Sequence, residues 1–184
     1  TKINQDWKSY QNVTDSYILK KNYEENFKKK FDLSFIIEFE EKMTSKFLKL
    51  PKTQEIKGAS KAVDFFMKET DYAICFATGS LLQPAYIKLA QAEINFVPAL
   101  VEASNEIYTR EAIVEAAIKR AEAYFQVDSF ETIISVGDGI WDLKTARNLG
   151  VHFLGINQKN LEDFKEENIK SHIEAVSYTH LTLP

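Results

Sequence analysis

The sequence predicts an α/β protein with a doubly wound, mostly parallel sheet and a small helical unit in front of it. From Gly58 onward, short apolar segments alternate with segments of helical period, the order typical of β-α-β units. Residues 1–57 are aromatic, have helical period and contain no strand pattern. With 184 residues, 45% of them hydrophobic, the chain has enough apolar material for one core and a small appended element. We therefore expect a helical cap at 1–57 and an α/β core at 58–175.

Two helices are expected in the cap. Apolar residues recur at helical spacing over residues 7–18 and again over residues 36–47. Pro51 closes the second helix, and the polar stretch 52–57 is the candidate hinge between the two units. Three cap aromatics are candidates for substrate contact, although their helical spacing favours a place in the core: Trp7, Tyr10 and Tyr17.

The elements of the core are expected in alternating order. Predicted strands cover 72–77, 95–101, 132–136 and 151–156. One helix follows Gly58, and a second opens at Ser80 and admits Pro84 in its first turn. The third is capped by Thr109, and its predicted inner face is Ile113, Ala117, Ala121 and Tyr124. The fourth covers 140–149 and is ended by Gly150.

Composition excludes several classes of protein. The net charge of -4 and the pI near 5.5 give no reason to expect nucleic acid as a partner, and the lysines at 28–30 suit a solvated helix face. One cysteine, Cys75, permits no intramolecular disulfide and suits a reducing compartment, where it would fill the interior. No stretch has the length of a membrane span or the layout of a signal peptide. We expect a cytoplasmic protein without a membrane partner, and the sequence leaves its oligomeric state open.

The last nine residues, 176–184, resemble a translated sequencing adapter. One permitted set of codons for VSYTHLTLP matches the transposon end of fragment libraries and the adapter behind it. The alternative is an ordinary β-prone terminus. We leave this segment, with His180, out of the predictions of fold and site.

The turn Thr78-Gly79-Ser80 follows the first predicted strand of the core. Ligands of parallel α/β sheets bind at the carboxyl ends of the strands. A hydroxyl and unpaired backbone N–H groups at a helix start there suit a phosphate oxygen. A simple helix cap explains the same residues, so the turn taken alone decides nothing.

Two carboxylates follow the third predicted strand, in Gly137-Asp138-Gly139-Ile140-Trp141-Asp142. Asp138 ends the strand, and Asp142 lies one helical turn further on, so both side chains are expected to face one crevice. Two hard oxygen donors beside glycines suit Mg²⁺, which completes its octahedron with waters and phosphate. The alternative is a Gly-Asp helix cap with Asp142 in solvent.

A basic residue, Arg110, begins the helix after the second predicted strand, 28 residues before Asp138. It is the candidate for binding phosphoryl oxygens. A solvated arginine at a helix start is the ordinary alternative. Lys119 is a second basic candidate, although it falls within the helix.

Together these elements resemble the last three motifs of the haloacid dehalogenase superfamily. The order and spacing match: a Thr after a strand, a basic residue at a helix start, and Gly-Asp-x-x-x-Asp after a later strand, over the span 58–156. The resemblance implies a Rossmann-like fold with a helical cap and a phosphatase that uses Mg²⁺ on a small phosphorylated metabolite. It implies that Thr78, Gly79 and Arg110 bind the phosphoryl group, Thr78 and Arg110 as catalytic residues, and that Asp138 and Asp142 serve the metal.

Two departures from the family pattern limit what the resemblance implies. Arg110 is followed by Glu111, where the family commonly has Lys-Pro. The first motif, an apolar strand ending in Asp-x-Asp that carries the nucleophile, has no counterpart before Trp7, so we expect a fragment without activity as given. The alternatives are a mutase or dehalogenase of the same fold, or a non-catalytic phosphate- or metal-binding or receiver-like module. His152 and His172 receive no role.

Overall fold

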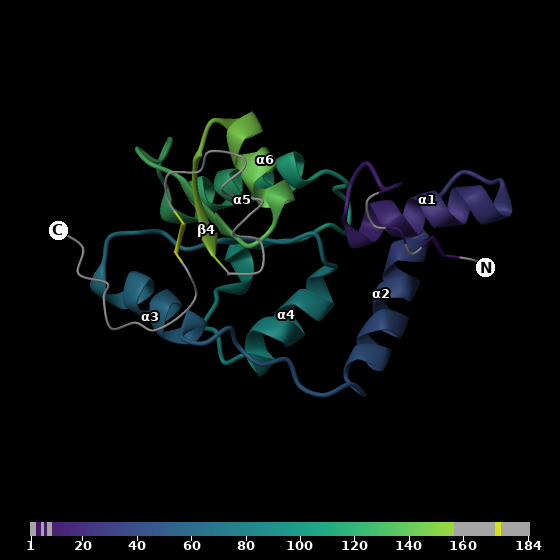
Figure 1. Ribbon diagram of the computed structural model, residues 1–184, viewed down its shortest axis with the longest axis horizontal. Coiled ribbons are helices and arrows are strands. Elements are labelled where there is room, and N and C mark those ends of the chain that lie inside the picture. The colour runs from purple at the N-terminus through teal and green to yellow at the C-terminus, as the bar shows by residue number, and fades with distance from the viewer. Residues whose placement is uncertain (1–2, 5, 7–8, 157–171, 174–184) are drawn as a thin grey trace.

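The computed structural model describes residues 3–4, 6, 9–156 and 172–173, and these form a mixed α/β protein (Figure 1). The helices are α1 (Asp15–Phe27), α2 (Ser34–Phe47), α3 (Ala59–Glu69), α4 (Leu82–Gln91), α5 (Arg110–Phe125) and α6 (Ile140–Leu149), with a 3₁₀ helix η2 at Pro98–Leu100. The strands are β1 (Phe76–Ala77), β2 (Val101–Glu102), β3 (Ile134–Gly137), β4 (His152–Ile156) and β5 (His172–Ile173). The mixed α/β class is confirmed. Trp7 and the segment 176–184 lie outside the described residues.

The strands form two parallel sheets, whereas the sequence analysis expected one. β1 pairs with β2 in the first sheet, and β4 lies between β3 and β5 in the second. α5 packs on β1 and β2, α6 packs on β3 and β4, and the two helices pack on each other. Within the described residues no ladder joins β1 to β3, so the α5–α6 layer connects the sheets. β5 was not predicted.

The first two strands of the core are shorter than predicted. Phe76 pairs with Val101 and Ala77 with Glu102, and extension of this register would set Ala73 opposite Pro98. The chain turns into the 3₁₀ helix η2 at Pro98, which has no N–H to donate to a ladder. The predicted strands 72–77 and 95–101 therefore keep only their last residues as paired strand. Cys75 lies just before β1, and its partial burial raises the pKa of its thiol.

The first helix begins at Asp15, so the helical prediction over residues 7–18 is wrong for residues 10–14. Thr14 is extended and caps the helix, because its hydroxyl accepts the Tyr17 N–H. Tyr10 is buried without being helical: its hydroxyl donates to the Asn4 carbonyl and accepts from the Asn22 amide. At Tyr10 the aromatic pattern therefore reflects burial, whereas Tyr17 is half-buried within α1.

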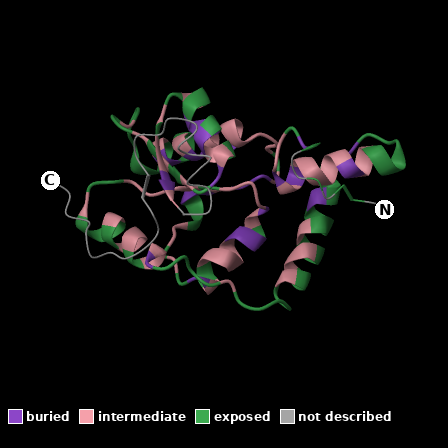
Figure 2. Ribbon diagram, viewed as in Figure 1, coloured by how far each residue is buried: buried purple, intermediate pink, exposed green. Residues whose placement is uncertain are grey.

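The α1–α2 pair forms a small core around Phe31 and Ile36, with Leu81 as its third buried member. Leu81 is fully buried although it belongs to the loop before α4. Figure 1 shows α1 and α2 at one end of the molecule, and Figure 2 shows a buried part of α2 where it meets α1. The α1–α2 pair therefore shares its core with a residue of the loop before α4.

α5 begins after its predicted cap, and α6 has the limits predicted for it. Thr109 caps α5 by accepting the Ala112 N–H, and Gly150 ends α6 with φ of 68°, a conformation that favours glycine. The predicted inner face of α5 is buried at its first three positions: Ile113, Ala117 and Ala121. The fourth, Tyr124, is 48% exposed, which corrects the prediction.

The hydroxyl of Thr14 connects the start of α1 to the segment before α5. The Thr14 side chain is 1% exposed, donates to the Tyr108 carbonyl at 2.9 Å and caps α1. We expect Thr14→Ala to lower the free energy of unfolding by about 2 kcal/mol, because a helix cap and a buried hydrogen bond are lost together. Urea denaturation measures the change. Thr14→Ser keeps the hydroxyl and should lose less; equal losses for both variants would show that the methyl group, and not the hydroxyl, stabilises this junction.

Candidate functional site

The predicted site residues lie just after β1 and β3 and at the starts of α5 and α6. Thr78 follows β1, and its N–H donates to the Glu102 carbonyl of β2. Its hydroxyl oxygen accepts the Ser80 N–H at 3.1 Å, so the turn is held by a local side-chain bond. The Thr78 hydroxyl can still donate its own proton to an anion, since it is only an acceptor in this bond.

The backbone N–H groups that open α4 are not unpaired, contrary to the sequence prediction. Three consecutive groups donate to side chains from three other segments: Leu81 to Asp15 at 3.2 Å, Leu82 to Asn105 at 2.9 Å and Gln83 to Glu40 at 2.8 Å. Carboxylate and amide oxygens thus satisfy the positive end of the helix. An anion at this turn would have to displace one of them.

Arg110, the first residue of α5, binds the acidic residue of α6. Its Nη1 donates to Asp142 Oδ1 at 2.9 Å and its Nη2 to the Val13 carbonyl at 3.4 Å. Gly79 lies against the same guanidinium, because a Cβ added there would be 3.3 Å from Nη2. The Nε of Arg110 is buried and has no hydrogen-bond partner among the described residues. The structure therefore brings Gly79, Arg110 and Asp142 together.

Asp138 and Asp142 have different surroundings. Asp138 is exposed at the end of β3, whereas Asp142 is partly buried. Asp142 Oδ1 accepts from Arg110 and Oδ2 accepts the Gly139 N–H at 3.1 Å. Burial raises the pKa of the Asp142 carboxyl; Arg110 and the Gly139 N–H oppose this shift, and the charge of Asp138 adds to it. A Cβ on Gly137 would lie 2.6 Å from Asp142 Oδ2, so this glycine makes room for that carboxylate.

The two carboxylates fit a magnesium ion in unequal roles. Both oxygens of Asp142 are engaged, so direct coordination there would break the contact with Arg110 or Gly139. Asp138, whose side chain is exposed, could ligate a metal ion directly. Among the residues that the structure describes, no three His, Cys, Asp or Glu side chains gather as a metal-ligand cluster.

Lys119, the second basic candidate, lies on α5 nine positions after Arg110. At 1.5 Å per residue this places it about 13 Å further along the helix axis. Its side chain is exposed. The geometry favours Arg110 as the basic residue beside the carboxylates.

Asp15 lies near this site and had no place in the sequence prediction. Its carboxylate accepts the Leu81 N–H and interacts electrostatically with Lys88 and Arg110. Lys88 Nζ also donates to Ser80 Oγ at 2.9 Å. Burial raises the pKa of Asp15, while the Leu81 N–H, Lys88, Ser80 and Arg110 oppose the shift. In the sequence Asp15 shows only a helix start, and no spacing connects it to residues 66 positions away.

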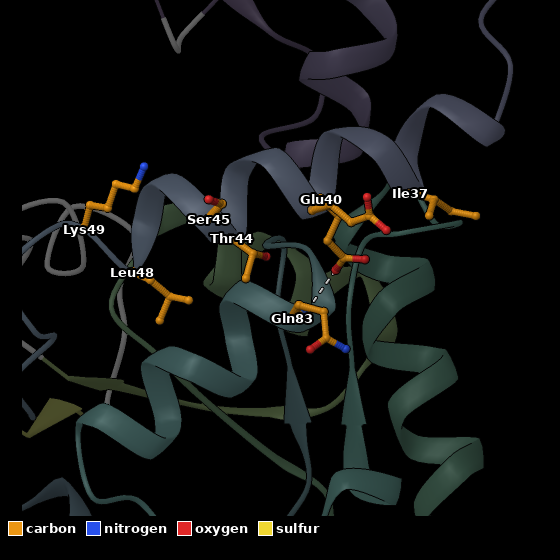
Figure 3. Close-up of a pocket in the computed structure, with 8 residues that line it drawn as sticks. Ile37, Glu40, Thr44, Ser45, Leu48, Lys49 and Gln83 are labelled. Atoms are coloured by element: carbon orange, nitrogen blue, oxygen red, sulfur yellow. Dashed lines mark hydrogen bonds between the residues drawn. The ribbon is translucent and has the colours of Figure 1, made fainter.

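A groove of about 660 Å³ lies between α2 and α4, apart from the predicted site residues (Figure 3). Its lining includes Ile37 and Thr44 of α2, Leu48 just after α2, and Gln83 of α4. Glu40 crosses from α2 to the first turn of α4, where the dashed line in Figure 3 marks its bond to the Gln83 N–H. A second bond, from the Asn105 amide to Glu40 Oε2, fixes the same carboxylate.

Comparison with known proteins gives no match: no protein-family model, no curated protein and no solved structure matches the chain. No described helix has the length and apolar content needed to cross a membrane. The fold and the site define a mixed α/β protein with parallel strands whose charged residues gather at strand ends and helix starts.

Proposed function

We propose that this chain carries the phosphate- and metal-binding part of a cytoplasmic, Mg²⁺-dependent phosphomonoester hydrolase of the haloacid dehalogenase superfamily. The observation that carries the proposal is the environment of Arg110. Its guanidinium lies against Gly79 and Asp142 and keeps a buried Nε without a partner among the described residues. A buried donor without an acceptor costs about 1–3 kcal/mol, which a phosphoryl oxygen would offset.

The roles follow from the chemistry of each group. Arg110 neutralises charge on the phosphoryl oxygens, and the Thr78 hydroxyl and the Gly79 backbone bind the same group. Asp142 holds the guanidinium in place through its 2.9 Å contact with Nη1. Phosphoryl transfer depends on positioning and charge neutralisation, which these residues provide.

Mg²⁺ at Asp138 would neutralise the charge that builds on the phosphoryl group. By the family resemblance, the attacking carboxylate and the general acid would belong to an Asp-x-Asp strand, a motif that these 184 residues do not contain. In the same proposal, that strand would join the two sheets into one doubly wound sheet. The substrate class is a small phosphorylated metabolite.

A non-catalytic reading has one observation in its favour. Asp142 is the third residue of α6 and accepts the Gly139 N–H, the arrangement of a helix cap, and its other oxygen is neutralised by Arg110. These contacts also occur in proteins in which such residues only stabilise a helix start. A phosphate-binding measurement separates the two readings.

We expect the chain to bind inorganic phosphate or vanadate, and Arg110→Ala and Thr78→Val to weaken that binding. Charge-assisted hydrogen bonds contribute about 1.5–3 kcal/mol, so Arg110→Ala should weaken binding about 10- to 100-fold and Thr78→Val by less. Isothermal titration at constant ionic strength gives the affinities, and Thr78→Val keeps the shape of the side chain it replaces.

Lys119→Ala is the matched control, because it removes one positive charge from the same helix at an exposed position. It should bind phosphate as the parent does. If Lys119→Ala alone weakened binding, the basic residue would be misassigned. If the parent bound no phosphate, the helix-cap reading would replace the proposal.

A further inference from the structure

The indole ring of Trp141 lies between Gly139 and Arg110. A Cβ added to Gly139 would stand 2.3 Å from Cε2 and 2.4 Å from Nε1 of the ring, distances that no real Cβ contact reaches. The ring therefore occupies the space that any side chain at position 139 would need. Glycine at this position permits the ring to lie on the backbone at the start of α6.

The guanidinium of Arg110 lies over this ring, with its Cζ 5.4 Å from the ring centroid. A guanidinium within about 6 Å of an indole centroid is attracted by the negative face of the ring. The ring, Asp142 Oδ1 and the Val13 carbonyl thus contact one planar group from three sides. Such contacts restrict both the position and the plane of the guanidinium.

Trp141 is 42% exposed, so solvent reaches the ring beside the guanidinium. The ring contacts Gly139 and also the guanidinium of Arg110. The Arg110 Nε remains without a partner among the described residues although the rest of the group is held. The arrangement fixes an arginine while leaving it donor capacity.

We propose that Trp141 is a positioning residue that holds Arg110 in the orientation in which it binds a phosphoryl group. This inference rests on the proposed function, since it assigns a role at the same anion site. Trp141 touches neither reacting atoms nor substrate and acts through the arginine. Loss of the ring frees the guanidinium to rotate, and part of the binding energy is then spent on ordering it.

The test uses the affinity of the chain for inorganic phosphate, measured by isothermal titration at constant ionic strength. Trp141→Leu should weaken phosphate binding about 3- to 10-fold, the range expected for a partly exposed cation–π contact. Trp141→Phe keeps a ring and should fall between Trp141→Leu and the parent. In an Arg110→Ala background, Trp141→Leu should change the affinity no further, because the residue it positions is absent.

A spectroscopic readout accompanies the titration. The chain has two tryptophans, so Trp7→Phe leaves Trp141 as the only one. Its fluorescence should change with phosphate and follow the binding curve, and Arg110→Ala should remove the change. Parent-like affinity in Trp141→Leu, or an equal loss with and without Arg110, would overturn the positioning role while leaving the phosphate site intact. A parent chain that binds no phosphate would overturn the proposed function and this role together.

Discussion

Asp138→Asn is expected to lower Mg²⁺-dependent phosphomonoester hydrolysis by more than about 100-fold in a protein that carries both this chain and the Asp-x-Asp strand. The neutral amide is a poorer ligand for a hard cation, and the site loses a charge that the metal needs. In the proposed function Asp138 ligates the metal directly; its side chain is exposed at the end of β3. Rates measured over a range of Mg²⁺ concentrations check the prediction.

Asp142→Asn provides the comparison. Its effect should be smaller, about 10-fold, the lower end of the range for residues that orient a metal site without ligating it. It should also lower the melting temperature, because the contact with Arg110 loses its charge. Parent-like rates and Mg²⁺ dependence in Asp138→Asn would show that the metal assignment is wrong.

The chain of 184 residues alone is expected to hydrolyse no phosphomonoester above blank, and an added strand should restore turnover. In the proposed function Thr78 and Arg110 bind the phosphoryl group and Asp138 and Asp142 serve the metal. By the family resemblance the attacking carboxylate is none of these residues. The place for the strand is suggested by the two sheets: β1 pairs only with β2, and β3 only with β4, among the described residues. On β3, Ile134 is 45% and Val136 is 57% exposed.

The experiment fuses an apolar strand ending in Asp-x-Asp to the chain, or adds it as a peptide. Pairing with both edges should raise the melting temperature, since unpaired edges and apolar side chains become covered. A matched strand ending in Asn-x-Asn should raise the melting temperature equally and give no turnover. Deletion of 176–184 should change neither. If the chain alone turned over substrate, the expectation that it lacks the nucleophile would be wrong, and so would the roles assigned to its residues.

The sequence predicted helices well where local signals determine them. The helix 140–149 was predicted with the limits found for α6, since its glycines mark both ends. Thr109 located α5 in the same way. The strands depended on partners: the turn at Pro98 prevents the ladder between β1 and β2 from extending, and a pattern of apolar residues does not show where a ladder stops.

The sequence identified the residues of the candidate site by their types and positions, but it did not predict the contacts between them. The pairing of Arg110 with Asp142 joins residues 32 positions apart, and nothing in either local pattern indicates it. The N–H groups at the start of α4 were expected to be unpaired. Their acceptors, such as Asp15 and Glu40, belong to helices distant in the sequence, so no local pattern reveals them. Only the packing of α1 and α2 against the α/β part places those carboxylates there.

Hydrogen exchange at three neighbouring amides of the first turn of α4 would report on three different segments of the chain. The N–H groups of Leu81, Leu82 and Gln83 stand next to one another, yet their acceptors belong to α1, to the loop after β2 and to α2. Hydrogen exchange at each amide therefore depends on a different segment remaining in place. Local detachment of α2 would speed exchange at Gln83 and spare Leu81, whereas detachment of α1 would do the reverse. Neighbouring peaks in one spectrum would then distinguish which part of the molecule opens first.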